Sequence, residues 1–212
     1  MVVEAIVRNV PRPPKYSNDL ILDAVIKVVR EAGPAAVSVA AVAETLGAPN
    51  GSIYHRFSSR DELLAAAWLR VATTFQQGFA RVLSERDPLT ASLGAATYTI
   101  DRARRRPAET HVLCLYRPTD LTKGSWPRPL TESVNRLGSQ LTDLLRHHAQ
   151  RLGGVSMTRV RFALVDVPNA AVRRSVAAGS PLDHEVEHLV RETVSALLGP
   201  EAATNPTNRM TA

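Results

Sequence analysis

The sequence is poor in cysteine and in aromatic residues, and it contains no long apolar run. Cys114 is the only cysteine among 212 residues, so no disulfide can form within the chain. A single thiol is typical of proteins from a reducing compartment. No apolar stretch approaches the ~20 residues that a membrane-spanning helix needs, and the apolar run near the N-terminus is too short for a secretion signal. We therefore expect a cytoplasmic protein without a membrane partner.

Small and aliphatic residues take the place of aromatic ones. Aromatic side chains make up only 5% of the chain, whereas apolar residues in total make up 44%, mainly alanine, leucine and valine. Such a composition favours helices packed against helices. The formal net charge of +6 suits a polyanionic partner, but it does not distinguish a nucleic acid from another anionic surface.

Helix caps, prolines and glycines divide the chain into about nine predicted helices, and no strand pattern is present. Pro168 lies inside the eighth helix and is expected to kink or split it, because proline lacks a backbone donor. Residues 117–128 are predicted to form a loop. The predicted helices cover about 18–32, 39–46, 50–56, 60–84, 88–106, 107–116, 129–152, 157–178 and 181–198.

The same pattern predicts two domains with a tail at each end. Residues 1–16 are predicted to form a flexible basic arm with several prolines. Residues 17–60 form a three-helix domain, and 61–200 form a larger helical domain. Residues 201–212 have no apolar pattern and are predicted to be disordered.

Residues 38–64 have the spacing of a helix-turn-helix. Ala43 is a small residue where two helices can touch, Gly47 can make the turn, and Ile53 and Phe57 can anchor the second helix inward. This arrangement leaves polar side chains on the outer face of the second helix, where they can reach base edges or phosphates. An ordinary helical hairpin is the alternative. The outward residues are Asn50, Ser52, Tyr54, His55 and Arg56.

The segment from Gly47 to Phe57, followed by Ser59 to Leu64, resembles the DNA-binding signature of the TetR family. That signature has a glycine turn, a small recognition helix, an aliphatic-Tyr-x-x-Phe anchor and a capped following helix. The close resemblance covers about residues 18–70. Pro49 stands where the family often has a capping Ser or Thr, and Arg60 replaces the usual lysine.

The resemblance implies an all-α bacterial transcriptional regulator with a defined set of DNA contacts. Ser38, Tyr54 and Arg60 would hold phosphates. Asn50, Gly51, Ser52 and His55 would lie at or near base edges, and glycine would allow the backbone to approach closely. The implied partners are double-stranded operator DNA, a second copy bound through about 157–198, and an unknown small-molecule effector. We expect a ligand-released repressor that is not an enzyme and has no cofactor and no metal.

The resemblance also implies an effector pocket in the second domain. Trp68 and Phe75 share a face of the fourth predicted helix, and such a stripe can equally be solid core. Other aromatic and polar side chains lie on segments that a TetR-like fold packs around the same centre. We therefore predict an apolar pocket, opening near 117–128, that is lined by part of the set Trp68, Phe75, Tyr98, His111, Tyr116, Trp126, Phe162 and Asp166.

Two further motifs leave alternatives open. His184, Glu185 and His188 match the H-E-x-x-H pattern of zinc proteases, which would make the chain an all-helical zinc-dependent enzyme. We expect instead the polar face of the last helix, because no third ligand follows. The arginines between 102 and 106 are expected to be solvated at the negative end of a helix dipole, the alternative being a second nucleic-acid patch. A helical interaction module without DNA binding is the remaining possibility.

Overall fold

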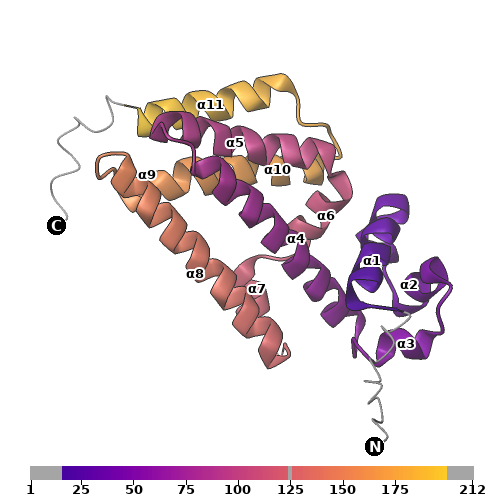
Figure 1. Cartoon of the computed structure of the whole chain (residues 1–212). Helices are drawn as coiled ribbons and strands as arrows, with labels where there is room; N and C mark the ends of the chain where they lie inside the picture. The colour runs from indigo at the N-terminus through magenta and orange to yellow at the C-terminus, as the bar shows by residue number, and fades with distance from the viewer. Residues whose placement is uncertain (1–15, 124–125, 200–212) are drawn as a thin grey trace, which may run out of the picture.

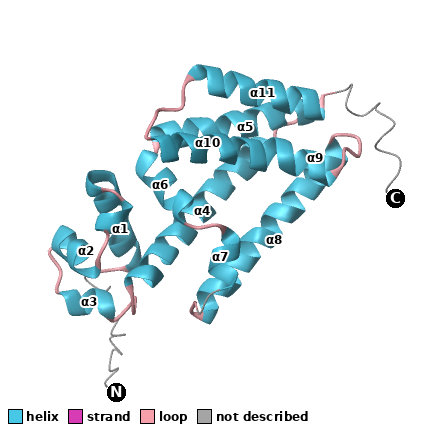
Figure 2. Cartoon of the chain, turned by 180° about the vertical axis from the view of Figure 1, so that it is seen from behind, coloured by secondary structure: helices cyan, strands magenta, loops and turns pink. Residues whose placement is uncertain are grey.

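The computed structural model describes residues 16–123 and 126–199, and these residues form helices and connecting segments without a strand. The expectations for the 1–15 part of the arm and for the tail from 200 onward therefore lie outside the described residues. Figures 1 and 2 show a small bundle of three helices beside a larger helical body. The helices are α1 (Asn18–Ala32), η1 (Pro34–Ala36), α2 (Val39–Leu46), α3 (Asn50–Tyr54), α4 (Arg60–Leu83), α5 (Pro88–Arg105), α6 (Pro107–Leu115), α7 (Pro118–Lys123), α8 (Arg128–Arg151), α9 (Met157–Arg161), η2 (Phe162–Asp166), α10 (Val167–Ala178) and α11 (His184–Leu198).

Most helices begin where a side chain can satisfy their first backbone donors. Ser17, Ser38 and Ser59 each accept a hydrogen bond from the backbone N–H three residues later, as N-cap residues do. Glu62 completes the cap of α4 one residue earlier than a standard capping box, because it accepts from the backbone N–H of Ser58 at 2.8 Å. These caps explain why α1, α2 and α4 begin where predicted. The last helix, α11, begins at His184 rather than Pro181, because Asp183 caps it by accepting from the backbone N–H of Val186.

The predicted eighth helix is divided near Pro168. It widens into a π-helical turn, η2, after α9, and α10 begins at Val167, directly before the proline. The backbone N–H of Val167 bonds to the carbonyl of Phe162, five residues earlier. Pro168 then occupies the first turn of α10, where its missing N–H costs no hydrogen bond.

The loop predicted at 117–128 is also partly wrong. Residues 118–123 form the short helix α7, which packs against α8. Asp120 accepts from the backbone N–H of Arg117 at 2.7 Å, and Pro118 suits a first helical turn. Because of this helix and the division of 157–178, the described part of the chain has more helical segments than the nine predicted.

The buried side chains of the described residues form two hydrophobic cores. The first core joins α1, α2 and α3 to the first half of α4 and to α6, and it includes Leu64, Trp68 and Val112. The second core joins the rest of α4 to α5, α8, α9, α10 and α11. Helix α4 therefore belongs to both cores, and α6 packs directly against α1. No helix among the described residues is long and apolar enough to cross a membrane.

Candidate nucleic-acid interface and effector cavity

Helices α2 and α3 form a helix-turn-helix with a tight glycine turn. Gly47 has φ 60° and ψ 36°, a left-handed conformation that glycine adopts without steric cost. The backbone N–H of Ala48 closes the turn on the carbonyl of Ala43 at 2.9 Å. Ile53 is fully buried and Phe57 almost so. The two anchors therefore fix which face of α3 points outward.

The outward face of α3 brings together the residues expected to meet DNA. Asn50, Gly51, Tyr54 and His55 are exposed and Ser52 is half-buried. The Tyr54 side chain has a relative exposure of 57%, which is high for a large aromatic residue. A Cβ added at Gly51 would meet nothing within 4 Å, so the fold itself does not require glycine at this position.

Ser38 and Arg60 lie close together at the start of α2, and both make contacts within the protein. The Ser38 hydroxyl caps α2 by accepting from the backbone N–H of Ala41 at 3.0 Å. The Arg60 guanidinium donates to the carbonyl of Val37 at 2.7 Å and to that of Pro34 at 3.1 Å. Arg60 therefore joins α4 to the segment before α2, a role that its sequence position did not reveal.

Two contacts missed by sequence reasoning hold the helix-turn-helix to its surroundings. Arg56 donates to the Asn18 side chain at 2.9 Å, so its guanidinium is engaged with α1. The Tyr16 hydroxyl donates to the carbonyl of Gly47 at 3.1 Å. Neither contact has a local sequence signal, because the partners are more than thirty residues apart.

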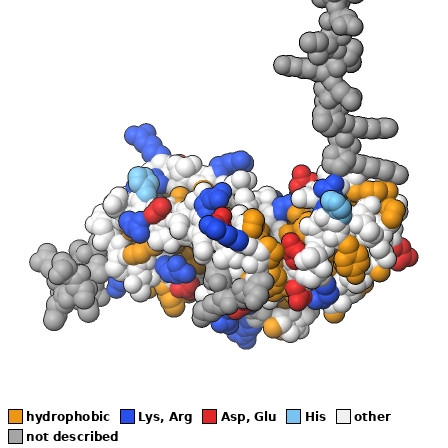
Figure 3. All heavy atoms as spheres, turned by 90° about the horizontal axis from the view of Figure 1, so that it is seen from below, with side chains coloured by type: hydrophobic (Ala, Val, Ile, Leu, Met, Phe, Trp, Pro, Cys, Tyr) orange, Lys and Arg blue, Asp and Glu red, His pale blue; other side chains and the backbone are white. Residues whose placement is uncertain are grey.

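The surface seen from below includes the end of the molecule that carries α3. On it, basic and acidic side chains are interspersed rather than gathered into one continuous patch (Figure 3). A small basic footprint provides limited phosphate binding from one copy of the chain.

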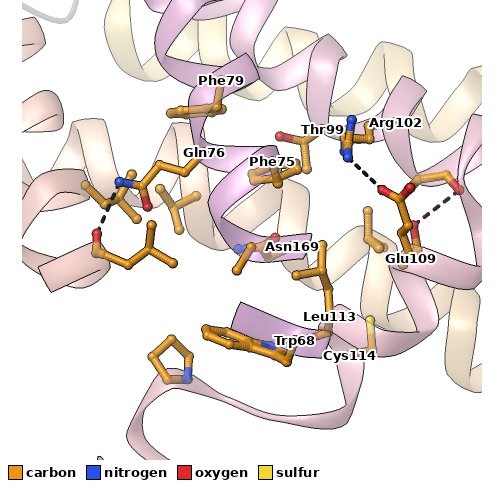
Figure 4. Close-up of a pocket in the computed structure, with 18 of the residues that line it drawn as sticks. Trp68, Phe75, Gln76, Phe79, Thr99, Arg102, Glu109, Leu113, Cys114 and Asn169 are labelled. Carbon is orange, nitrogen blue, oxygen red and sulfur yellow. Dashed lines mark hydrogen bonds and ion pairs between the residues drawn. The ribbon is translucent and has the colours of Figure 1, made fainter. Parts of the chain in front are cut away.

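A cavity of about 200 Å³ lies inside the larger helical body, bounded by α4, α5, α6, α8 and the segment from η2 to α10. Its wall is mostly apolar, with Arg102 and Glu109 on one side and Gln76 on the other (Figure 4). Three of the residues predicted to line a pocket do line it, namely Trp68, Phe75 and Tyr116.

Five predicted residues lie elsewhere, for local reasons. Tyr98 faces a surface groove, and its hydroxyl donates to the carbonyl of Phe75 at 3.3 Å. His111 bonds back to the carbonyl of Pro107 at 2.8 Å. The Trp126 ring packs edge-on against Tyr116 at 5.9 Å, outside the cavity. Phe162 and Asp166, at the two ends of the π-helical turn, are both exposed.

The polar groups of the cavity come from residues that the sequence did not single out for this role. Arg102 and Glu109 form an ion pair at 2.6 Å. Arg173 donates to the carbonyls of Cys114 and Tyr116 at 3.0 and 3.1 Å, and so caps the C-terminal end of α6. Burial raises the pKa of the Cys114 thiol, which keeps this group protonated and unreactive at neutral pH.

The H-E-x-x-H motif lies on the exposed surface of α11. His184, Glu185 and His188 are all exposed, and His188 faces Glu192 at 3.2 Å. The described residues contain no group of three or more His, Cys, Asp or Glu side chains placed to hold a metal ion. The motif therefore has the geometry of a solvated helix face.

A helix-turn-helix with an exposed recognition face, attached to a helical body with an internal cavity, defines a DNA-binding transcriptional regulator. The family model described as "Bacterial regulatory proteins, tetR family" matches residues 21–67. Residues 21–67 of this chain are therefore similar to the DNA-binding segment of TetR-family regulators.

Several solved structures share the fold of this chain. The fatty acid degradation regulator FadR of Bacillus halodurans has a TM-score of 0.65 and 19% identity, over 89% of this chain and 97% of that one. The TetR-family regulator PfmR of Thermus thermophilus has a TM-score of 0.60 and 19% identity, over 84% and 96%. FadR of Bacillus subtilis, in complex with stearoyl-CoA, has a TM-score of 0.63 and 14% identity, over 86% and 98%. At these identities the likeness is one of fold. No curated protein matches the sequence.

Proposed function

We propose that this regulator is a homodimeric repressor that is released from its operator when a small molecule enters the cavity. The observation that carries this proposal is the position of α6. One end of α6 lines the cavity through Leu113 and Cys114, while the same helix packs against α1 of the DNA-binding domain. A ligand that moves α6 therefore also moves the recognition helix.

Three hydrogen bonds make the position of α6 sensitive to what the cavity holds. The Trp68 indole donates to the carbonyl of Leu113 at 3.2 Å, and Arg173 binds the carbonyls that follow it. Trp68, Leu113 and Arg173 all line the cavity. An effector that displaces Trp68 or Arg173 changes the position of α6, and it acts to the extent that it binds one position of α6 better than the other.

The proposed DNA contacts are those of the outward face of α3 and its flanks. Asn50, Gly51, Ser52 and His55 read bases, while Ser38, Tyr54 and Arg60 hold phosphates. The exposure of Asn50, Gly51, Tyr54, His55 and Arg60 supports this assignment, and Ser38 and Ser52 are half-buried beside them. We take residues 17–60 as the DNA-binding domain and 61–200 as the regulatory domain, with α6 as the joint between them.

A homodimer through about 157–198 is part of the same proposal. Phe162 and Leu189 lie in this region with relative exposures of 49% and 53%. Large apolar side chains exposed on one region are typical of a buried interface. A symmetric dimer reads two half-sites of an operator, which offsets the small basic footprint of one copy.

Selection of bound fragments from the source genome tests the proposal. We expect a few fragments to be enriched, to contain an inverted repeat, and to be retarded in a gel shift that weakens with salt. A metabolite extract should release them, and a reporter gene behind the fragment should then become active. Enrichment of no fragment would contradict DNA recognition, whereas binding that no extract releases would contradict only the effector.

A further inference from the structure

A groove on the surface between α5 and α11 lies beside the cavity and is unusually rich in arginine. It encloses about 410 Å³, and Asp101 is the only carboxylate among its lining residues. Thr97 and Gly94 form part of its wall. Its four arginines are Arg102, Arg105, Arg106 and Arg191.

The groove and the cavity share a wall. Arg102 lines both of them. Tyr98 lines the groove, and its ring lies 5.4 Å from the ring of Phe75, which lines the cavity. A ligand that reaches past Arg102 and Tyr98 can therefore occupy both spaces.

The positive charge of this region exceeds what its carboxylates balance. Glu109 is shared by Arg102 at 2.6 Å and Arg106 at 3.6 Å. Asp101 is shared by Arg104 at 3.6 Å and Arg105 at 3.5 Å. Arg191 donates to the neutral hydroxyl of Thr97 at 3.0 Å. Arg104 is also paired with Glu187, so three carboxylates serve these four arginines, while Arg191 brings a further positive charge to the groove.

Arg102 provides a second, independent sign of a missing anion. Its Nε atom is buried and has no hydrogen-bond partner, although one terminal nitrogen of the guanidinium is paired with Glu109. A buried donor of a charged group is rarely left without an acceptor. An oxygen of an anionic ligand would satisfy it.

We propose that the effector is an amphiphilic anion, whose apolar part occupies the cavity and whose phosphate or carboxylate head lies in the arginine groove. This inference rests on the cavity being the effector site. Arginine side chains bind both kinds of oxyanion through paired N–H donors. The cavity, at about 200 Å³, is smaller than the roughly 300–1,000 Å³ of sites for drug-sized ligands, so the apolar part is a short or medium chain.

The groove does not form part of the proposed DNA interface. Helices α5 and α11 lie at the top of the molecule in Figures 1 and 2, whereas α3 lies at the bottom. An arginine surface this far from the recognition helix is free to bind a ligand while α3 contacts DNA. The alternative of a second nucleic-acid patch at Arg102 to Arg106 is accordingly disfavoured.

Binding of matched ten-carbon probes to the full chain tests the inference. The probes are decanoate, decyl phosphate and decanoyl-CoA as anions, with decanol as the uncharged control, measured by isothermal titration calorimetry. We expect at least one anion to bind the wild-type protein about tenfold or more tightly than decanol, since charge-assisted hydrogen bonds are of this size. The anion that binds best identifies the head group as carboxylate, phosphate monoester or nucleotide diphosphate.

The groove is then removed by Arg105→Gln, Arg106→Gln and Arg191→Gln together. All three residues are exposed in a single copy of the chain, so the variant should fold. Because Arg191 lies within the range proposed for the dimer interface, the Arg105→Gln, Arg106→Gln pair provides a version that leaves this range unchanged. We expect the advantage of the anion over decanol to disappear. Arg136→Gln, an equal loss of charge at an exposed position of α8, should leave it unchanged.

Each unfavourable result has a distinct meaning. Three results would overturn the proposal that the effector has an anionic head group. They are equal binding of decanol and the anions, absence of binding by any probe, and an unchanged preference for the anion in the triple variant. None of these results affects the proposed repressor, which fails only if no operator is found or no extract releases it.

Discussion

The Nε atom of Arg60 donates a hydrogen bond to the carbonyl oxygen of Val37 at 2.7 Å. Val37 immediately precedes Ser38, the N-cap of α2. The contact therefore fixes the first turn of α4 to the segment that positions the helix-turn-helix. Since Arg60 is also a proposed phosphate contact, its replacement should affect both folding and DNA affinity.

Arg60→Ala should reduce the salt dependence of DNA binding and also lower stability. Loss of one phosphate contact lowers the slope of log affinity against log salt by about one unit per copy of the chain. Loss of the two carbonyl hydrogen bonds should lower the free energy of unfolding by about 1 kcal/mol. Arg60→Lys keeps the charge, so it should retain the slope but not the full stability.

DNA affinity measured at several salt concentrations tests the role of Arg60 in phosphate binding. Tyr54→Phe is the matched control for these measurements, because it removes a proposed phosphate contact without removing charge. We expect weaker binding to all sequences alike, with little change in salt slope. If the slope of log affinity against log salt is unchanged in Arg60→Ala, then Arg60 does not hold a phosphate and has only a structural role.

Gly51→Leu should weaken DNA binding without weakening the fold. A Cβ at Gly51 meets nothing within 4 Å, and a non-glycine residue in a helix stabilises it by about 0.5–1 kcal/mol. The added side chain would stand between α3 and the base edges. Gly138→Ala, in α8 with similarly open space, should give the stability gain alone. If Gly51→Leu binds DNA with wild-type affinity, then the backbone at Gly51 does not lie close to the base edges.

Asn50→Ala and His55→Ala should each relax base preference at one position of each half-site. A good base contact contributes about 1–3 kcal/mol of discrimination. Repeating the fragment selection with each variant measures the effect. His147→Ala, at an exposed position of α8, should return the wild-type operator. If the α3 variants also return it at full stringency, the proposed docking of α3 is wrong.

Acidification should destabilise the larger helical body through His148. Burial first, and then the charges of Arg151 and His147, lower the pKa of this imidazole from 6.5 to about 4. The unfolded chain therefore binds a proton between these values that the folded chain does not. Stability is fully present above pH 6.5 and is lost as the pH falls toward 4, by about 3 kcal/mol in total.

Denaturant unfolding of wild-type protein and of His148→Gln at pH 7, 6, 5 and 4 checks this expectation. The variant should lose less stability over the range, because it lacks the titrating group. His184→Gln, at an exposed position of α11, should behave as wild type. Parallel curves for wild type and His148→Gln would show that His148 does not titrate as expected.

Local signals were sufficient to predict most of the fold. Ser17, Ser38 and Ser59 cap helices that begin where predicted. The reason is that the first backbone donors of a helix need an acceptor within three residues. The spacing of Gly47, Ile53 and Phe57 likewise determined which side chains of α3 face outward, because a helix of known period has only one face opposite its anchors.

Only the tertiary structure decided which residues line the cavity and which arginines are paired. Trp68 lines the cavity and Phe162 is exposed, although both are aromatic residues on helices, because the packing of their helices in the fold places one side chain inside and the other at the surface. Arg104 meets Glu187 across 83 positions of the chain, whereas Arg105 and Arg106 remain exposed beside it. Such partnerships depend on how α5, α6 and α11 pack, and packing joins residues that no local pattern connects.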